Sequence, residues 1–370
     1  MKIGYEAKRI FHNKTGLGNY SRDVIRVLST YYSSNSYLLY NPKKSDQFLF
    51  EANNKNVFEK NPKTKFAREF KNYWRQKGIV NDLKIDNITL FHGLSGELPV
   101  GLKANNIKSV VTIHDLIFMR YPKLYSFFDR KIHYLKFKKS AKAADKIIAI
   151  SEQTKLDIIT YLDVSPEKIE VIYQGCQAVF KEQYTTKEKE DVVARYNLPE
   201  NFILNVGTIE ERKNALTIVK AIKNIDSTLV LVGRETTYSD KIKEYIKKNN
   251  LDDKVIFLKG LSSKDLAITY QLATIFVYPS IFEGFGIPII EALYSKTPVI
   301  TTNSGVFPEA GGPDSLYIDP FNDIELEKKI NLLLNDSNLR REISEKGFQF
   351  VQKFNDENIA SKINKLYSEL

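Results

Sequence analysis

The sequence predicts an α/β protein made of two doubly wound domains with parallel sheets, and three observations support this prediction. The chain has 370 residues, which is enough for two domains that each bury a core. Short apolar runs alternate with helical stretches in both halves, which favours parallel sheets covered by helices. The order strand, glycine loop, helix start also occurs once in each half, an order typical of ligand-binding loops.

The composition narrows the class of protein. The chain has one cysteine, Cys176, so no internal disulfide can form, which suits a reducing compartment. The beginning of the sequence lacks the apolar stretch of a signal peptide, and no run approaches 18 apolar residues. We therefore expect a cytoplasmic protein.

The positive charge is concentrated in the N-terminal half. The net charge is +10, but residues 1–180 hold 30 Lys and Arg against 17 Asp and Glu, which leaves 25 against 28 in the remainder. Cations alternate with aromatic residues over 68–77 and 121–146. This pattern favours either a peripheral contact with an anionic membrane, on its inner face, or solvated helices whose aromatic residues lie in the core. No nucleic-acid motif accompanies the charge, so we expect no nucleic-acid partner.

Regular elements in the N-terminal half follow from apolar periodicity. Gly16 and Gly18 precede an amphipathic helix over about 18–30, and the loop lacks the third glycine of a nicotinamide-binding fingerprint. Either a plain tight turn or a substrate loop fits these two glycines. The predicted strands are Ile3–Tyr5, Tyr37–Tyr40, Ile88–His92, Ser109–His114, Lys146–Ser151 and a last strand over Val171–Gly175.

Two of the four histidines stand where ligands bind to parallel sheets. His92 and His114 each end a predicted strand, and ligands lie at the carboxyl ends of such strands. A single histidine at a strand end is more often structural than functional, and that interpretation stays open for both. We expect His133 on the surface of a basic helix, and Ser151 as the N-cap of a helix.

The second half begins a new alternation after a polar connection over residues 181–192. Arg212 and Lys213 follow its first strand and precede a helix. Such a pair suits a diphosphate, because Arg binds two oxygens in a fork and Lys adds a point charge; the alternative is two ordinary surface cations, which are common in a chain with 55 Lys and Arg residues. The predicted strands are Phe202–Val206, Thr228–Gly233, Val255–Phe257, Ala273–Tyr278 and Pro298–Thr302, and two or three helices fill 323–370.

One stretch of the second half carries most of the information. After the strand that ends at Tyr278 come Glu283, a glycine loop over 284–286, a proline that suits a first helical turn, and Glu291. Such a loop presents backbone N–H groups and a positive helix end to an anionic or hydroxyl-rich ligand. The two carboxylates can accept hydrogen bonds from sugar or ribose hydroxyls. Glu291 could instead complement the helix dipole.

The string Glu-Gly-Phe-Gly-x-Pro-x-x-Glu-Ala over 283–292 resembles the signature of the retaining glycosyltransferases of family 4. This resemblance implies the GT-B fold, in which two Rossmann-like domains face a central cleft. We expect an N-terminal acceptor-side domain over 1–180, completed by a helix over about 355–370, and a nucleotide-sugar-binding domain over 193–354. The implied donor-sugar contacts are Glu283 and the loop residues Gly284, Phe285, Gly286 and Ile287, with Glu291 on the ribose.

Other strings extend the resemblance. The string around Thr208, Arg212 and Lys213 resembles the family's phosphate motif, although Glu211 stands where the family usually has Pro. By the same resemblance, the loop at Leu261 lies against the base, and His114 faces the donor sugar. The string at Gly16 and Gly18 resembles a loop of a mannosyltransferase-like branch, with Asn19 in place of the usual Arg.

The resemblance implies a retaining hexosyltransferase that uses a nucleoside-diphosphate sugar. GDP-mannose is the favoured donor and a glycan or lipid-linked molecule the favoured acceptor; a UDP-sugar is the alternative donor. A UDP-sugar epimerase and a non-catalytic membrane-surface scaffold are the other functions considered. No Asp-x-Asp motif stands near the predicted site, and cations already serve the phosphates, so we expect no required metal.

Overall fold

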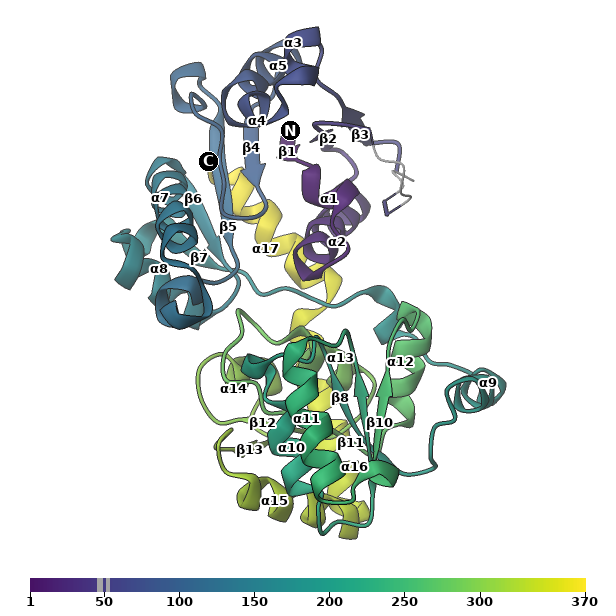
Figure 1. Ribbon diagram of the computed structural model, residues 1–370. Helices are drawn as coiled ribbons and strands as arrows, with labels where there is room; N and C mark the ends of the chain where they lie inside the picture. Colours follow the sequence, from purple (N-terminus) through teal and green to yellow (C-terminus); the bar gives the residue numbers. More distant parts are fainter. Residues whose placement is uncertain (45–48, 51–53) are drawn as a thin grey trace. The chain divides into compact units, whose positions relative to one another are not determined.

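The computed structural model describes residues 1–44, 49–50 and 54–370, and the chain divides into two compact units (Figure 1). Unit 1 comprises Met1–Gly175 and Phe354–Leu370, and unit 2 comprises Cys176–Lys353. Within the described residues, no helix has the length and apolar character needed to cross a membrane.

Unit 1 is built on a parallel sheet, as the alternation of strands and helices predicts. Within the described residues the sheet has seven strands, in the order β3-β2-β1-β4-β5-β6-β7, and every neighbouring pair is parallel. The strands are β1 (Lys2–Glu6), β2 (Ser36–Tyr40), β3 (Val57–Lys60), β4 (Leu90–Gly93), β5 (Lys108–Ile113), β6 (Lys146–Ala149) and β7 (Ile169–Val171).

Helices complete the core of unit 1. The last helix, α17, lies beside α2, and its buried side chains, among them Ile363 and Leu366, join the same apolar cluster as strand β1 (Figure 1). The single tryptophan, Trp74, is buried here and donates a hydrogen bond from Nε1 to Asp82 Oδ2 at 2.8 Å. The helices are α1 (Lys8–His12), α2 (Gly16–Tyr31), α3 (Lys65–Glu69), α4 (Lys71–Tyr73), α5 (Ile79–Ile85), α6 (Ile117–Arg120), α7 (Phe127–Ala143), α8 (Glu152–Leu162) and α17 (Asp356–Ser368), with a π-helical turn over Trp74–Gly78 and 3-10 turns over Lys103–Asn105, Pro122–Leu124 and Pro166–Lys168.

Unit 2 repeats the architecture with a second parallel sheet. Its order is β10-β9-β8-β11-β12-β13 within the described part of the chain. The strands are β8 (Phe202–Val206), β9 (Thr228–Val232), β10 (Val255–Leu258), β11 (Ile275–Tyr278), β12 (Val299–Thr302) and β13 (Leu316–Ile318). The helices are α9 (Thr186–Tyr196), α10 (Ala215–Ala221), α11 (Thr237–Lys248), α12 (Ser263–Leu272), α13 (Ile287–Tyr294), α14 (Phe307–Gly311), α15 (Asp323–Asn335) and α16 (Ser337–Val351), with 3-10 turns over Ala178–Lys181, Glu211–Lys213, Asp252–Lys254 and Gln352–Phe354.

Each sheet has one point at which the order of its strands reverses. In unit 1 the chain moves outward from β1 to β2 and β3, and then starts again on the other side of β1 with β4. In unit 2 the reversal lies between β8 and β11. Loops leave the carboxyl ends of the two strands in opposite directions at such a switch point, which makes it the usual ligand site of an open α/β sheet.

Several local expectations need correction. The last strand of unit 1 is Ile169–Val171, so the expected strand over Val171–Gly175 is placed too late. A short helix, α1, separates β1 from Gly16 and Gly18, which belong to the first turn of α2, and the polar stretch over 181–192 contains the start of α9. Thr185 caps α9 in a reciprocal arrangement with Glu188, so its polarity reflects a helix start as well as a connection.

Two local expectations are confirmed. Ser151 caps α8 by accepting a hydrogen bond from the backbone N–H of Thr154 at 3.0 Å. His133 lies exposed on α7.

Candidate functional site

Two loops of unit 2 meet at its switch point. Arg212 and Lys213 end a 3-10 turn that follows β8, and Glu283 lies in the loop that follows β11. The loops are joined through the backbone, because the N–H of Ile281 donates to the carbonyl oxygen of Arg212 at 2.8 Å. The three charged residues predicted from separate parts of the sequence therefore lie together.

Glu283 is held through one of its two carboxylate oxygens. Oε1 forms ion pairs with Arg212 Nη1 at 2.8 Å and Lys213 Nζ at 3.5 Å. It also accepts hydrogen bonds from the hydroxyl groups of Tyr278 at 2.7 Å and Ser280 at 3.1 Å. Within the described residues Oε2 has no partner. The side chain is thus fixed in orientation and keeps one oxygen for a ligand.

The charge state of Glu283 follows from two opposing effects. Burial raises the pKa of its carboxyl group, but the nearby charges of Lys213 and Arg212 and the hydrogen bond from Tyr278 outweigh burial and lower the pKa to about 2. The carboxylate is therefore ionised at neutral pH. Arg212 is also paired with Glu210, with 2.6 Å between Nη2 and Oε1.

Lys213 has a defined position against an aromatic ring. Its Nζ donates a hydrogen bond to the hydroxyl group of Tyr278 at 2.8 Å and lies 5.2 Å from the centre of that ring. Gly207 makes room for it, because a Cβ there would lie 2.7 Å from Nζ, and the φ of +143° disfavours any other residue.

Glu291 has a different environment from Glu283. It is buried on α13, and its Oε2 accepts a hydrogen bond from the hydroxyl group of Tyr270 at 3.0 Å. Burial raises its pKa to about 8, against the lowering effects of Tyr270 and Lys213, so the carboxyl group is mostly protonated at neutral pH. Helix α13 begins at Ile287, which puts Glu291 beyond the first turn, and the alternative role as a dipole-complementing acid is not supported.

The glycine loop leads directly into α13. Gly286 is its N-cap with a φ of +109°, and Pro288 stands in the first turn, as the sequence predicts. Phe285 is buried and fixes the loop on the core. Gly284 and Ile287 flank these two residues, and both are half-buried.

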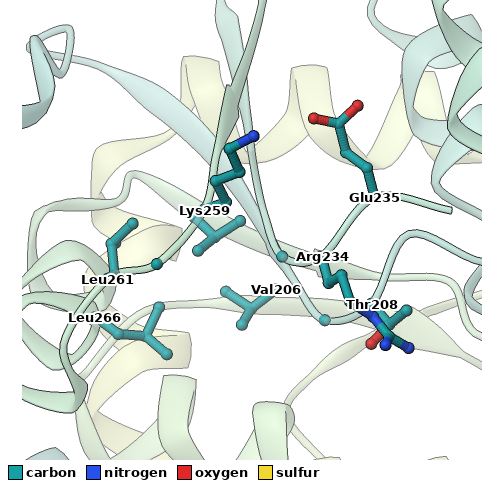
Figure 2. Close-up of a pocket in the computed structure, with 11 residues that line it drawn as sticks. Val206, Thr208, Arg234, Glu235, Lys259, Leu261 and Leu266 are labelled. Atoms are coloured by element: carbon teal, nitrogen blue, oxygen red, sulfur yellow. The ribbon is translucent and has the colours of Figure 1, made fainter.

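A cavity of about 640 Å³ opens at the carboxyl ends of β8, β9 and β10 (Figure 2). Figure 2 shows apolar side chains, such as Val206 and Leu261, on one side and the polar side chains of Thr208 and Arg234 on the other. Its size is within the range of small-molecule sites. The cavity is lined by Val206, Gly207, Thr208, Val232, Gly233, Arg234, Glu235, Lys259, Gly260, Leu261 and Leu266.

The sequence identifies only part of this environment. Thr208 and Leu261 are predicted site residues, and both line the cavity. Arg234 and Glu235 are not among the predicted site residues. Both directly follow a predicted strand, and the rule that ligands bind at the carboxyl ends of parallel strands, used above for His114, would have selected them too. Tyr278 is also missed as an anchor for Glu283, because its place at the end of a buried strand gives no sign of where its hydroxyl group points.

The predicted residues of unit 1 lie at the carboxyl edge of the first sheet. His114 Nε2 donates a hydrogen bond to the carbonyl oxygen of Leu94 at 2.9 Å, and its ring meets Tyr20 edge to face, with 4.5 Å between the ring centres. Burial lowers the pKa of His114 to about 4, so its ring is neutral at pH 7. Because Nε2 carries the hydrogen, Nδ1 is left as an acceptor.

Gly16 and Gly18, predicted to form a loop before a helix, lie instead in the first turn of α2 (Gly16–Tyr31), and one of them is sterically demanding. A Cβ on Gly18 would lie 1.9 Å from the carbonyl oxygen of Asn13, whereas nothing lies within 4 Å of one on Gly16. Gly18 is therefore required for the close approach of this backbone, whereas the packing around Gly16 does not require a glycine.

His92 has a structural environment. It is fully buried between the hydroxyl groups of Tyr367, 2.6 Å from Nδ1, and Thr112, 2.8 Å from Nε2. Burial lowers its pKa to about 3, so this histidine links α17 to the sheet as a neutral group.

The solved structures with similar folds define the class. The Anabaena protein Alr3699/HepE, solved in complex with UDP, superposes with a TM-score of 0.79 at 16% identity and with full coverage of both chains. A sucrose-phosphate synthase from Thermosynechococcus elongatus gives a TM-score of 0.79 at 22% identity, covering 100% of this chain and 98% of that one. The fold, two Rossmann-like units with parallel sheets, is that of the GT-B class.

The family follows from the sequence comparisons. Residues 39–178 match the family model described as Glycosyltransferase Family 4, and residues 186–350 match the model described as Glycosyl transferases group 1. The chain belongs to glycosyltransferase family 4 and is a glycosyltransferase.

Two relatives are named as mannosyltransferases. O-antigen chain mannosyltransferase B of Escherichia coli is 24% identical with full coverage of both chains. O-antigen chain mannosyltransferase RfbU of Salmonella typhimurium is 34% identical over 212 residues, which are 57% of this chain and 56% of RfbU. The chain therefore spans about half the length of RfbU.

Proposed function

We propose that this glycosyltransferase moves a hexose, with mannose favoured, from a nucleoside-diphosphate sugar to a glycan or lipid-linked acceptor in polysaccharide synthesis, with retention of the anomeric configuration. The observation that carries the proposal is the cluster of Arg212, Lys213 and Glu283 beside a cavity of about 640 Å³. The names of the mannosyltransferase relatives favour GDP-mannose as the donor. The UDP complex of HepE supports a UDP-sugar as the alternative.

The cluster and the cavity suit different parts of such a donor. The cavity, with its apolar side at Val206 and Leu261, would take the base and Thr208 would lie near the phosphates. Arg212 and Lys213 would neutralise the diphosphate. The unpaired Oε2 of Glu283, together with the glycine-loop amides over 284–287, would hold the sugar.

Glu291 would bind the ribose through Oε1, since Tyr270 already occupies Oε2. On the acceptor side, Gly16 and Gly18 would let a substrate approach the start of α2. His114 would contact the sugar or the incoming hydroxyl through its unprotonated Nδ1.

The proposed chemistry is departure of the nucleoside diphosphate. Negative charge develops on the leaving oxygen as its bond to the anomeric carbon breaks, and fixed cations aimed at this charge are usually the largest catalytic contribution. The cluster offers no residue placed as a covalent nucleophile, which favours attack by the acceptor hydroxyl on the same face that the diphosphate leaves. The hydroxyl oxygen bonds to the anomeric carbon as the bond to the diphosphate breaks, and its proton passes to the departing phosphate oxygen. Since two cations already serve the phosphates, we propose that no divalent metal is required.

A thermal-shift screen with nucleotides tests this function. We expect GDP and GDP-mannose to raise the melting temperature by several degrees at about 100 times the dissociation constant, where binding adds about 2.7 kcal/mol. GMP is the matched control, because it lacks the second phosphate that Arg212 and Lys213 would bind. A larger shift with UDP than with GDP would favour the alternative donor, and no shift with any nucleotide would favour the scaffold.

We also propose that unit 1 contacts an anionic membrane surface through α7. Phe128, Ile132 and Leu135 are 76%, 52% and 56% exposed, and their spacing of four and three residues aligns them on one face of the helix. Exposed lysines flank this face at 131 and 136, and the exposed Lys139 continues it at the next turn. An apolar stripe bordered by cations is typical of a helix that lies in a membrane interface. The alternative, in which the aromatic residues are core, holds for the half-buried Phe137 but not for Phe128.

Co-sedimentation with liposomes tests the membrane proposal. The double variant Phe128→Ser, Ile132→Ser should bind anionic vesicles roughly tenfold more weakly or worse, because two exposed apolar side chains no longer enter the interface. The double variant Phe321→Ser, Ile324→Ser is the matched control, since these residues of unit 2 are 70% and 62% exposed. Binding should also weaken with salt. Equal binding to neutral and anionic vesicles would contradict the role of the lysines.

A further inference from the structure

The switch point of unit 1 holds an arginine that the proposed function does not use. Arg9 lies on α1, just after β1, and its Nε donates a hydrogen bond to Ser95 Oγ at 2.7 Å, just after β4. This contact bridges β1 and β4, the two strands between which the strand order reverses. Arg9 therefore stands where an open α/β sheet usually binds its ligand.

Arg9 has two carboxylates nearby, Glu6 and Glu97, but both are paired with other cations. Glu6 pairs with Arg75 at 2.6 Å, and Glu97 lies between Arg75 at 3.7 Å and Lys136 at 3.4 Å. Within the described residues Arg9 forms no ion pair, and its two terminal nitrogens have no protein partner. Three cations, Arg9, Arg75 and Lys136, therefore lie near the carboxylates of residues 6 and 97. Both carboxylates form their ion pairs with the cations other than Arg9.

The loop that orients Arg9 is rigid. The backbone N–H of Gly96 donates to the carbonyl oxygen of Thr112 at 2.8 Å, and the preceding Leu94 accepts the hydrogen bond from His114. A Cβ on Gly96, whose φ is +77°, would lie 2.5 Å from the ring of Phe137. The Ser95 hydroxyl is therefore fixed between two anchored residues, and it holds the guanidinium in one orientation before any ligand arrives. Such preorganisation reduces the cost of binding.

The equivalent point of unit 2 shows what is distinctive here. At the switch point of unit 2, Arg212 follows the first strand, β8, and pairs with Glu283. Glu283 lies in the loop after β11, the strand on the other side of the reversal. Arg212, however, forms ion pairs with two carboxylates, Glu210 and Glu283. Arg9 meets a hydroxyl group instead, so no carboxylate of the described residues is paired with its guanidinium.

We propose that Arg9, oriented by Ser95, binds a phosphate or diphosphate group carried by the acceptor. A guanidinium held through Nε presents its two terminal N–H groups as a fork that matches two phosphate oxygens. The proposal rests on the proposed function in one respect: that unit 1 receives the acceptor. It adds the acceptor's chemical class, because a neutral glycan would leave the Arg9 guanidinium without an ion-pair partner.

Binding of phosphate compounds to the full chain tests the proposal. The Lys213→Ala background weakens competing binding at the cluster in unit 2. In that background, farnesyl diphosphate and mannose 6-phosphate are titrated by calorimetry against Arg9→Gln and against Lys8→Gln, an exposed neighbour whose substitution removes the same charge. We expect Arg9→Gln to weaken at least one ligand roughly tenfold to hundredfold, and Lys8→Gln to change it by less than about twofold.

The two ligands distinguish the source of the phosphate. A loss confined to farnesyl diphosphate indicates a lipid carrier, and a loss confined to mannose 6-phosphate indicates a phosphorylated glycan. Arg9→Lys, which keeps the charge but not the fork, should bind with intermediate affinity. Equal binding by Arg9→Gln and Lys8→Gln, or no binding of either ligand, would overturn the proposal.

A separate measurement keeps this proposal distinct from the proposed function. With Lys213 intact, Arg9→Gln should keep the full thermal shift with the nucleotide, because Arg9 belongs to the other unit. If no nucleotide binds but phosphate binding still depends on Arg9, the proposed function fails and the anion site stands.

Discussion

Replacing Lys213 with alanine should lower the turnover of sugar transfer by roughly 10²–10³, the loss seen when one group that stabilises developing charge is removed from an active site. Nζ of Lys213 is fixed by Tyr278 and Glu283, so its charge is in place before the diphosphate begins to leave. Turnover measured at saturating donor, with the accepted nucleotide sugar from the thermal-shift screen, gives the change directly.

The fold should survive this substitution, because Arg212 remains to pair with Glu283 at 2.8 Å. Far-UV circular dichroism of Lys213→Ala should therefore match that of the unmodified protein. Lys220→Ala is the matched control, since Lys220 is an exposed lysine on α10 in the same unit, and its turnover should not change. Turnover of Lys213→Ala equal to that of this control would remove Lys213 from the mechanism.

The substitution Glu283→Gln should destabilise unit 2 by on the order of 3 kcal/mol at pH 7, because it leaves the half-buried cations Arg212 and Lys213 without their shared carboxylate. The pKa gives a similar figure. Lowering it from its ordinary value of 4.5 to about 2 corresponds to on the order of 3 kcal/mol of folding free energy.

The pH dependence has a definite sign. Because the pKa of Glu283 is depressed in the folded state, its contribution is complete above about pH 4.5 and is lost as the pH falls toward about 2. The difference between the unmodified protein and Glu283→Gln should therefore shrink over this window. A difference that stays constant from pH 7 to pH 2.5 would show that charge pairing is not its cause.

Urea unfolding can assign the loss to one unit. The only tryptophan, Trp74, lies in unit 1, so its emission follows that unit, whereas far-UV circular dichroism follows both. Glu283→Gln should shift the circular dichroism transition to lower urea and leave the Trp74 transition nearly unchanged. Glu345→Gln is the control, because the exposed pair of Glu345 and Lys296 should contribute less than about 1 kcal/mol.

The sequence predicts best those features that a short local pattern determines. The strands buried in the middle of each sheet are apolar runs, and the glycine loop with Pro288 specifies the start of α13, so both are predicted. The edge strand β3 is not, because its residues Val57–Lys60 include two charged side chains on an exposed edge. Strand β13, at the edge of the second sheet, is also not predicted, because its three apolar residues, Leu316–Ile318, are too few to form a distinct run.

Side-chain environments are harder to predict, since they depend on residues far away in the chain. The sequence suggests that Glu283 and Glu291 are similar carboxylates, yet one has a pKa of about 2 and the other of about 8. The difference arises because two cations reach Glu283, while burial dominates around Glu291, whose hydroxyl partner comes from a helix 21 residues earlier. The environment of Arg9 cannot be predicted from its neighbours in the sequence either. Arg9 comes close to the loop after β4 only when β1 and β4 pair in the sheet.

Helix α17 imposes an order on synthesis. Its side chains Ile359, Ile363 and Leu366 fill the core of unit 1, but the ribosome makes them only after the whole of unit 2. The nascent first unit must therefore wait with an open apolar face while the second unit, which is contiguous in the chain, can close at once. A translational pause or a chaperone contact would matter most during the interval between residue 175 and residue 354.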